Sequence, residues 1–325
     1  MFNKLPSHNV PLVLIADVLC YLINYNSSPS TEELRRFTGK SEAYIRSSIS
    51  ICKLLNVINE DGCIDKYAES LGRTPDDDLK INVMRKFIQE YEPFITFIQY
   101  HLNGATLEES ARKVYVSYKF EGKDHVFLKD LFLSWGTTTG IFSNTTEGII
   151  LDEKIQKQYA AIDRLEVNLT EDIAIRLYIS NRLGDEIFSK LTSAEVSELV
   201  DAYLKCSNDA RGSIECAGRA FEDFLRRMAL SVKIDVSRKN GISEVTNALY
   251  NNRDASNVNH NMIHSKQHNI SIAIGDIRNM AGHSLEARTM ERWNLTTHSA
   301  KIYVELVLST MRSIYDYIHN SIYNF

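Results

Sequence analysis

Near the C-terminus, Arg278 and His283 have four residues between them, and the polar Asn279 directly follows the arginine. A guanidinium can hold a phosphate through two parallel hydrogen bonds and stabilise negative charge that builds on it. An imidazole titrates near neutral pH and can take the proton of an attacking hydroxyl. These three residues therefore form a candidate catalytic site for cutting a phosphodiester, and the chemistry requires no metal or other cofactor.

Four arginine–histidine pairs in the chain have a similar spacing, so the neighbouring residues must decide among them. Arg278 follows an apolar run with helical spacing and precedes Ala281 and Gly282, whose small side chains let a substrate backbone approach. Positions five apart on a regular helix lie about 140° apart, so the helix must end or bend at Gly282 for His283 to face the same site. The other pairs are Arg253 with His260, Arg292 with His298 and Arg312 with His319.

A purely structural role is the alternative for the same residues. Arg278 can pair with Asp276 or Glu286, and a histidine at the end of a helix is favoured by the negative end of the helix dipole. Spacing alone does not separate this alternative from catalysis.

The Arg-Asn-x-x-x-His sequence lies after a long amphipathic helix and before a final long helix, and it resembles the motif of the HEPN superfamily. The resemblance covers about residues 165–325 and includes a long helix through 218–227 and a terminal helix over 297–323. It implies a helical bundle in which Arg278 and His283 are the catalytic pair of a metal-independent endoribonuclease. Glu222 and Arg226 are expected to support that pair from the helix packed against it.

The same resemblance implies a toxin or an antiviral abortive-infection effector that cuts RNA and is restrained or triggered by a protein partner. His283 would take the proton of a ribose 2′-hydroxyl, whose oxygen attacks the adjacent phosphorus to leave a 2′,3′-cyclic phosphate. Asn279 would orient the phosphate or a base. A homodimer is expected, because the terminal helix carries enough apolar residues for a core face and a dimer face. The alternatives are a non-catalytic HEPN and winged-helix scaffold and a nucleic-acid-binding regulator.

The composition is typical of a folded protein of two or three domains, with 325 residues, 44% of them hydrophobic and 24% charged. The chain has neither a long apolar run nor a signal-peptide layout, so we expect a cytoplasmic protein that does not enter a membrane. The net charge of −5 argues against nucleic-acid binding by bulk electrostatics. Five cysteines without paired short spacing argue against a zinc ribbon and a disulfide scaffold.

Proline positions and capping boxes predict a mainly α protein. All five prolines lie within the first 93 residues, and apolar residues recur at helical spacing through the rest. In a capping box, a Ser or Thr and a Glu three residues later bond to each other's backbone at a helix start. Such pairs predict helices over 31–38, 107–118 and 193–206.

Residues 1–75 are predicted to form a winged-helix-like domain. Helices expected over 11–24, 31–37 and 42–55 precede an Asp-Gly turn between short apolar runs, which indicates a β-hairpin wing. A similar order recurs within residues 76–155, where helices over 107–118 and 126–135 precede a second hairpin pattern. A linker is expected within 152–169, and the HEPN-like bundle over 165–325.

The third helix of the first domain is the candidate for nucleic-acid contact. Its exposed face would include Arg46, Ser47 and Lys53, which could contact DNA in the major groove. Acidic residues at the start of this helix and at the wing tip would repel phosphates. This favours protein docking over DNA binding.

The longest polar run, over residues 251–269, is predicted to be a loop beside the motif. It contains His260, His264 and His268, which are four residues apart and would share one face of a helix. Histidines at this spacing can bind zinc with a carboxylate. Because no glutamate follows the first histidine and no cysteine is near, a solvated segment or a contact with RNA is favoured over a metal site.

Overall fold

The computed structural model describes residues 3–59, 61–146, 148–163, 169–253, 261–282 and 291–325. The fold is mainly α-helical, as predicted, with one two-stranded antiparallel sheet among the described residues. Contacts divide the chain into two compact units, residues 1–156 and 157–325. The boundary lies inside α8 (Glu153–Asp163), within the stretch expected to be a linker.

The first unit begins with three helices and a short hairpin, in the predicted order. The hairpin is a single antiparallel bridge between Ile58 and Ile64. Helix α1 is the centre of this part, since its apolar face packs against α2, α3, α4 and a short 3-10 helix. The elements are α1 (Leu12–Asn24), α2 (Thr31–Thr38), α3 (Glu42–Leu54), η1 (Lys66–Leu71) and α4 (Asp77–Glu90).

The rest of the first unit repeats the order of three helices and a hairpin. Phe94, Phe97, Phe132 and Trp135 form its buried aromatic core. The segment before α1 pairs with the loop after α6, where Glu121 exchanges backbone hydrogen bonds with Asn3 and Leu5. The elements are α5 (Glu92–Leu102), α6 (Leu107–Ser117), α7 (His125–Thr138), β1 (Phe142–Thr145) and β2 (Gly148–Leu151).

All three predicted capping boxes are present, and the three helices begin at the predicted residues. Ser30, Thr106 and Thr192 each accept from the backbone N–H three residues later, and the glutamate there accepts from the cap backbone. These boxes could be predicted because both partners lie within one helical turn of the same segment.

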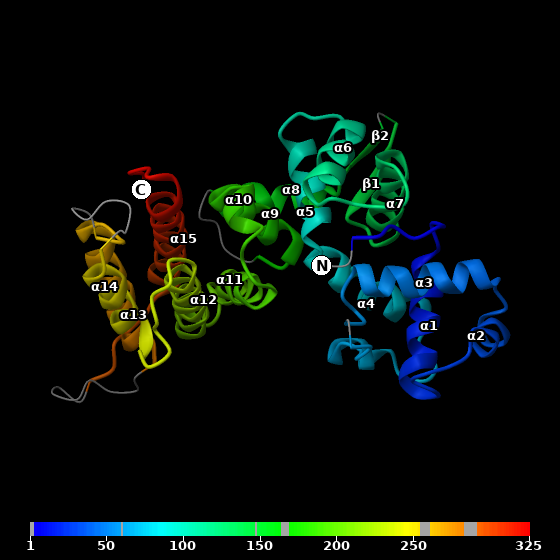
Figure 1. The fold of residues 1–325 in the computed structure, drawn as a ribbon, viewed down its shortest axis with the longest axis horizontal. Helices are drawn as coiled ribbons and strands as arrows, with labels where there is room; N and C mark the ends of the chain where they lie inside the picture. The colour runs from blue at the N-terminus through cyan, green and yellow to red at the C-terminus, as the bar shows by residue number, and fades with distance from the viewer. Residues whose placement is uncertain (1–2, 60, 147, 164–168, 254–260, 283–290) are drawn as a thin grey trace. The chain divides into compact units, whose positions relative to one another are not determined.

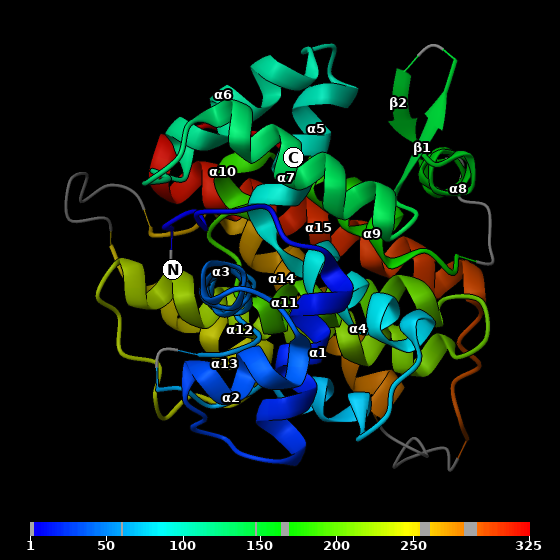
Figure 2. The same cartoon turned by 90° about the vertical axis from the view of Figure 1, so that its right-hand side faces the viewer.

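The second unit is a bundle of helices around α12, which contacts α11, α13, α14 and α15 (Figure 1; Figure 2). Phe221, Phe224 and Leu225 of α12 are fully buried between them. None of the described helices is long and apolar enough to cross a membrane. The elements are α9 (Asp172–Leu183), α10 (Asp185–Phe188), α11 (Ser193–Lys205), α12 (Ala210–Ser231), α13 (Gly241–Asn251), α14 (Ser265–Gly282) and α15 (Thr297–Asn320).

Candidate functional site

Arg278 lies near the end of α14 with its aliphatic stem across α12. A β-carbon at Gly218 of α12 would be 2.5 Å from Arg278 Cγ and 3.2 Å from Arg278 Cβ. Because glycine has no side chain, the two helices approach closely enough for the arginine to pass over the α12 backbone. Gly218 was expected only to lie in the long helix through 218–227, although a glycine inside a long helix is also a signal of such close packing.

Tyr303 of α15 is the third residue at this contact. Its hydroxyl would lie 3.1 Å from a β-carbon at Gly218, and it donates a hydrogen bond to the carbonyl oxygen of Ile274 at 3.1 Å. Burial raises the pKa of Tyr303 well above its usual value, and the positive charge of Arg278 offsets this only in part. The hydroxyl is therefore protonated at neutral pH and positions neighbouring groups as a hydrogen-bond donor.

Arg278 is half-buried, and the adjacent Asn279 is exposed. Within the described part of the chain, neither an acidic side chain nor a hydrogen-bond acceptor holds the guanidinium of Arg278. Asp276, the partner considered in the structural alternative, is exposed, and residues two apart on a helix do not face each other. Glu286, the other partner considered, lies outside the described residues.

The described part of α14 runs to Gly282, and whether the helix breaks there, as expected, depends on residues outside the described part of the chain. Arg211 of α12 holds this end, since its Nη1 atom donates to the carbonyls of Met280 and Ala281 at 2.9 Å each. Its Nη2 atom donates to the carbonyl of Trp293. A cation at a helix C-terminus satisfies carbonyls that lack intrahelical partners.

Arg211 therefore ties together the chain before and after the segment that contains His283. His283 itself lies outside the described residues. Sequence reasoning missed Arg211 because it lies about seventy residues before its partners, and no local pattern connects them.

Glu222 and Arg226, expected to support the motif, form an ion pair at 2.6 Å on α12. Arg226 also donates to the carbonyls of Val236 and Lys239, at 3.2 and 2.8 Å, in the turn that leads to α13. Among the described residues, no hydrogen bond or ion pair joins either side chain to Arg278. The contacts of this pair fix the connection between α12 and α13.

The polar run is not a loop throughout, because residues 265–269 form the first turn of α14. The His264 backbone N–H donates to Gln267 Oε1 at 2.9 Å, and the His264 ring accepts from the backbone of Lys266 at 3.2 Å. These polar groups form hydrogen bonds that begin the helix. The polar composition of the segment was therefore a sign of a helix start and not of a loop.

The three histidines of the run do not share a described site. His268 contacts Asn247 Oδ1 at 2.8 Å, and its ring packs at a tilt against Tyr250, with ring centroids 4.5 Å apart. The ring of His264 lies beside Tyr317 and Tyr323 instead. His260 lies outside the described residues. Across the part of the chain that the structure describes, no group of three His, Cys, Asp or Glu side chains could hold a metal ion.

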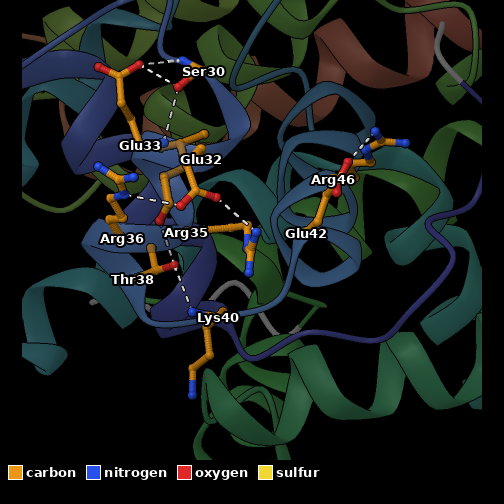
Figure 3. A network of polar contacts seen from close by, with 10 residues as sticks. Ser30, Glu32, Glu33, Arg35, Arg36, Thr38, Lys40, Glu42 and Arg46 are labelled. Carbon is orange, nitrogen blue, oxygen red and sulfur yellow. Dashed lines mark hydrogen bonds and ion pairs between the residues drawn. The ribbon is translucent and has the colours of Figure 1, made fainter.

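Helices α2 and α3 carry a network of paired charges (Figure 3). Arg46 of α3 pairs with Glu42 one turn earlier, and Arg35 and Arg36 of α2 both pair with Glu32, at 2.9 and 3.1 Å. Each of these arginines therefore has a carboxylate beside it. The positive charge that a phosphate backbone would meet on this surface is reduced accordingly.

Part of the exposed face expected on α3 is covered by the chain itself. Lys53 is exposed, but Ser47 is only 1% exposed, so its predicted accessibility was wrong. Ser47 Oγ lies 3.1 Å from Ser7 Oγ and accepts from the backbone N–H of His8 at 3.2 Å. The segment before α1 thus covers part of the α3 face that was expected to contact the major groove of DNA.

No protein-family model, curated protein or solved structure matches this chain.

Proposed function

We propose that this protein is a metal-independent endoribonuclease of the HEPN type, acting as a toxin or an antiviral abortive-infection effector. The observation that supports this most is the position of Arg278, whose guanidinium has no protein partner among the described residues although its stem is held against Gly218 and near Tyr303. An arginine that serves only packing usually has its donors satisfied by carboxylates or carbonyls. A guanidinium whose stem is anchored and whose tip has no partner among the described residues suits a phosphate ligand.

In the proposed reaction, His283 removes the proton of a ribose 2′-hydroxyl, and the 2′ oxygen attacks the adjacent phosphorus. The bond from phosphorus to the 5′ oxygen breaks, and that oxygen takes a proton from the imidazolium. The products are a 2′,3′-cyclic phosphate and a 5′-hydroxyl. Arg278 stabilises the charge that develops on the non-bridging oxygens, and Asn279 orients the phosphate or a base.

The proposal includes a homodimer through α15 and a regulatory role for the first unit. Val304, Val307 and Met311 of α15 are buried in the bundle, whereas Ile302 on another face is 49% exposed. That face would meet a second copy. The first unit contains two successive segments, each with three helices followed by a hairpin. Each segment would form a winged-helix-like module, and these modules would dock a protein inhibitor or trigger.

The test is induced expression of the native chain, Arg278→Ala and His283→Ala, followed by growth and cellular RNA integrity. Arg36→Ala is the matched control, because the Arg36 side chain is 79% exposed on α2, in the unit that does not carry the motif. Loss of toxicity and at least a ~100-fold loss of RNA cleavage are expected in both motif variants, with Arg36→Ala unchanged. Circular dichroism melting verifies that each variant is folded.

Cleavage at a position that carries a 2′-deoxyribose would exclude the proposed mechanism. Equal cleavage by the native chain and both folded motif variants would exclude the proposed site. If the purified dimer and its variants all leave RNA intact and growth is unaffected, the non-catalytic scaffold is the better description.

A further inference from the structure

A polar cavity of about 300 Å³ lies in the second unit, between α9, α15 and the C-terminal segment. Figure 2 shows α9 beside α15, which the contacts between the two helices confirm. Arg312 is nine residues beyond Tyr303, or about 13 Å along the helix axis, so this cavity is separate from the Arg278 site. Its lining residues are Arg182, Leu308, Ser309, Arg312, Ser313, Asn324 and Phe325.

Two arginines meet at this cavity from different helices. Arg312 Nη1 donates to the carbonyl oxygen of Arg182 at 3.1 Å, which brings the Arg312 side chain to the end of α9. The side chains of Arg182 and Arg312 are 44% and 51% exposed, so both remain accessible to a ligand. An Arg pair is suited to a phosphate, because each planar guanidinium can donate two parallel hydrogen bonds to its oxygens.

The acidic groups nearby do not fully neutralise the two arginines. Arg182 Nη2 is 3.3 Å from Glu305, whose other carboxylate oxygen already accepts from Tyr178 and Tyr203 at 3.0 and 2.6 Å. Arg312 Nε is 3.9 Å from Asp316, which is beyond hydrogen-bond distance.

The remaining polar groups of the cavity can complete a ligand's hydrogen bonds. Ser313 Oγ accepts from Gln267 Nε2 at 2.9 Å, which leaves the hydroxyl hydrogen of Ser313 able to donate. Ser309 and Asn324 add a hydroxyl and an amide. The ring of Phe325 is 69% exposed at the same cavity and offers a flat apolar face.

We propose that this cavity binds a free mononucleotide, with the phosphate between Arg182 and Arg312 and the base stacked on Phe325. Paired guanidiniums recognise the phosphate, the hydroxyl and amide groups recognise the sugar or base edge, and the aromatic ring recognises the base face. The volume is at the lower end of the range for small-molecule sites, which fits a single nucleotide. The site is independent of the proposed ribonuclease activity.

The test is isothermal titration calorimetry of the full chain with AMP, GMP, CMP and UMP, and with adenosine and inorganic phosphate as separate probes. At least one monophosphate is expected to bind, and Arg312→Gln should weaken it at least tenfold. Arg238→Gln is the matched control, because it removes the same charge from an exposed loop of the same unit, and it should bind like the native chain. Adenosine should bind at least tenfold more weakly than AMP.

A second variant keeps the test decisive if Arg312→Gln does not fold. Phe325→Ala changes an exposed side chain and should weaken nucleotide binding while leaving phosphate binding unchanged. Absence of binding by all four monophosphates at millimolar concentration would overturn the proposal. So would equal binding by Arg312→Gln and Arg238→Gln, equal affinity for phosphate and AMP, or binding of a 5′-phosphorylated RNA oligonucleotide but of no free nucleotide.

Discussion

The side chain of Arg278 on α14 lies across Gly218 on α12, so closely that a β-carbon at position 218 would be 2.5 Å from Arg278 Cγ. The same β-carbon would be 3.1 Å from the hydroxyl of Tyr303 on α15. Gly218 is therefore the point at which three helices of the bundle meet. The packing of these helices and the position of the proposed phosphate-binding guanidinium both require a glycine at position 218.

Gly218→Ala is expected to destabilise the second unit and to impair the site. Crowding in a packed interior costs about 1–3 kcal/mol, whereas alanine gains about 1 kcal/mol over glycine inside a helix. The crowding should exceed the gain, because the atoms met are the Cβ and Cγ of Arg278, which cannot swing aside as the tip of a side chain can. Urea denaturation would measure a net loss of about 1 kcal/mol in the free energy of unfolding, and RNA cleavage would fall with it.

The cause can be tested in the Arg278→Ala background, which removes the Cγ atom. There Gly218→Ala should cost clearly less than in the native chain. Gly282→Ala is a matched control, since a β-carbon at Gly282 would meet no atom of the described residues within 4 Å. An equal cost of Gly218→Ala in both backgrounds would show that Arg278 is not the crowded group.

The buried hydroxyl of Tyr303 predicts a loss of stability at alkaline pH. Burial raises the pKa of Tyr303, so the folded protein keeps this proton at a pH where the unfolded chain has lost it. The contribution of the protonated Tyr303 hydroxyl to the free energy of unfolding is fully present below about pH 10, where an unfolded tyrosine titrates. This contribution is lost as the pH rises beyond that value. Between about pH 10 and about pH 11.5, the native chain should lose up to about 1.4 kcal/mol per pH unit more than Tyr303→Phe.

Urea denaturation at a series of pH values would measure this difference. At neutral pH, Tyr303→Phe should cost about 1 kcal/mol, because the hydrogen bond to the Ile274 carbonyl is lost. Tyr25→Phe is the control, as Tyr25 is 54% exposed. Parallel stability curves for the native chain and Tyr303→Phe above pH 10 would contradict the prediction.

The sequence predicted those features whose causes are local. The helix starts after Ser30, Thr106 and Thr192 depend on residues within one turn of each other. Short-range patterns report such interactions directly, because both partners appear in the same few residues.

The contacts that position the candidate site could not be predicted in this way. Arg211 bonds to carbonyls near the end of α14, and Gly218 meets Arg278 some sixty residues later. The segment before α1 covers Ser47, about forty residues away, and so removes a side chain that helical spacing alone placed on the surface. Such pairings depend on tertiary packing, for which one sequence carries no local signal.

Arg211→Ala is expected to loosen the end of α14 and the return of the chain at Trp293. Three carbonyls would lose a charged donor, and hydrogen bonds to charged groups contribute about 1.5–3 kcal/mol when they are buried. Because this site is partly exposed, a loss of about 1–2 kcal/mol in local stability is expected. Amide hydrogen exchange should become faster at residues 280–282, and RNA cleavage should fall because the chain around His283 loses its anchor.

Arg219→Ala is the matched control on the same helix, since Arg219 forms an outward ion pair with Glu198 at 2.8 Å. It should leave exchange at residues 280–282 at the native rate. If Arg211→Ala also leaves exchange and cleavage at native values, Arg211 does not position this segment.

Among the ion pairs described for the second unit, the pair between Glu195 and Arg227 should be especially costly to break. Glu195 is 1% exposed and lies 2.9 Å from Arg227 Nε, while its other oxygen accepts from the backbone and hydroxyl of Thr192. Arg227→Met leaves a buried carboxylate with only its capping partners, which should cost about 3 kcal/mol in the free energy of unfolding. Adding Glu195→Gln should recover most of this loss, because a neutral amide still caps α11 without a buried charge.

Urea denaturation of both single variants and the double variant would measure the coupling between Glu195 and Arg227. Arg219→Met, which breaks an exposed pair, should cost less than about 1 kcal/mol; a similar cost for Arg227→Met would show that water reaches the Glu195 carboxylate.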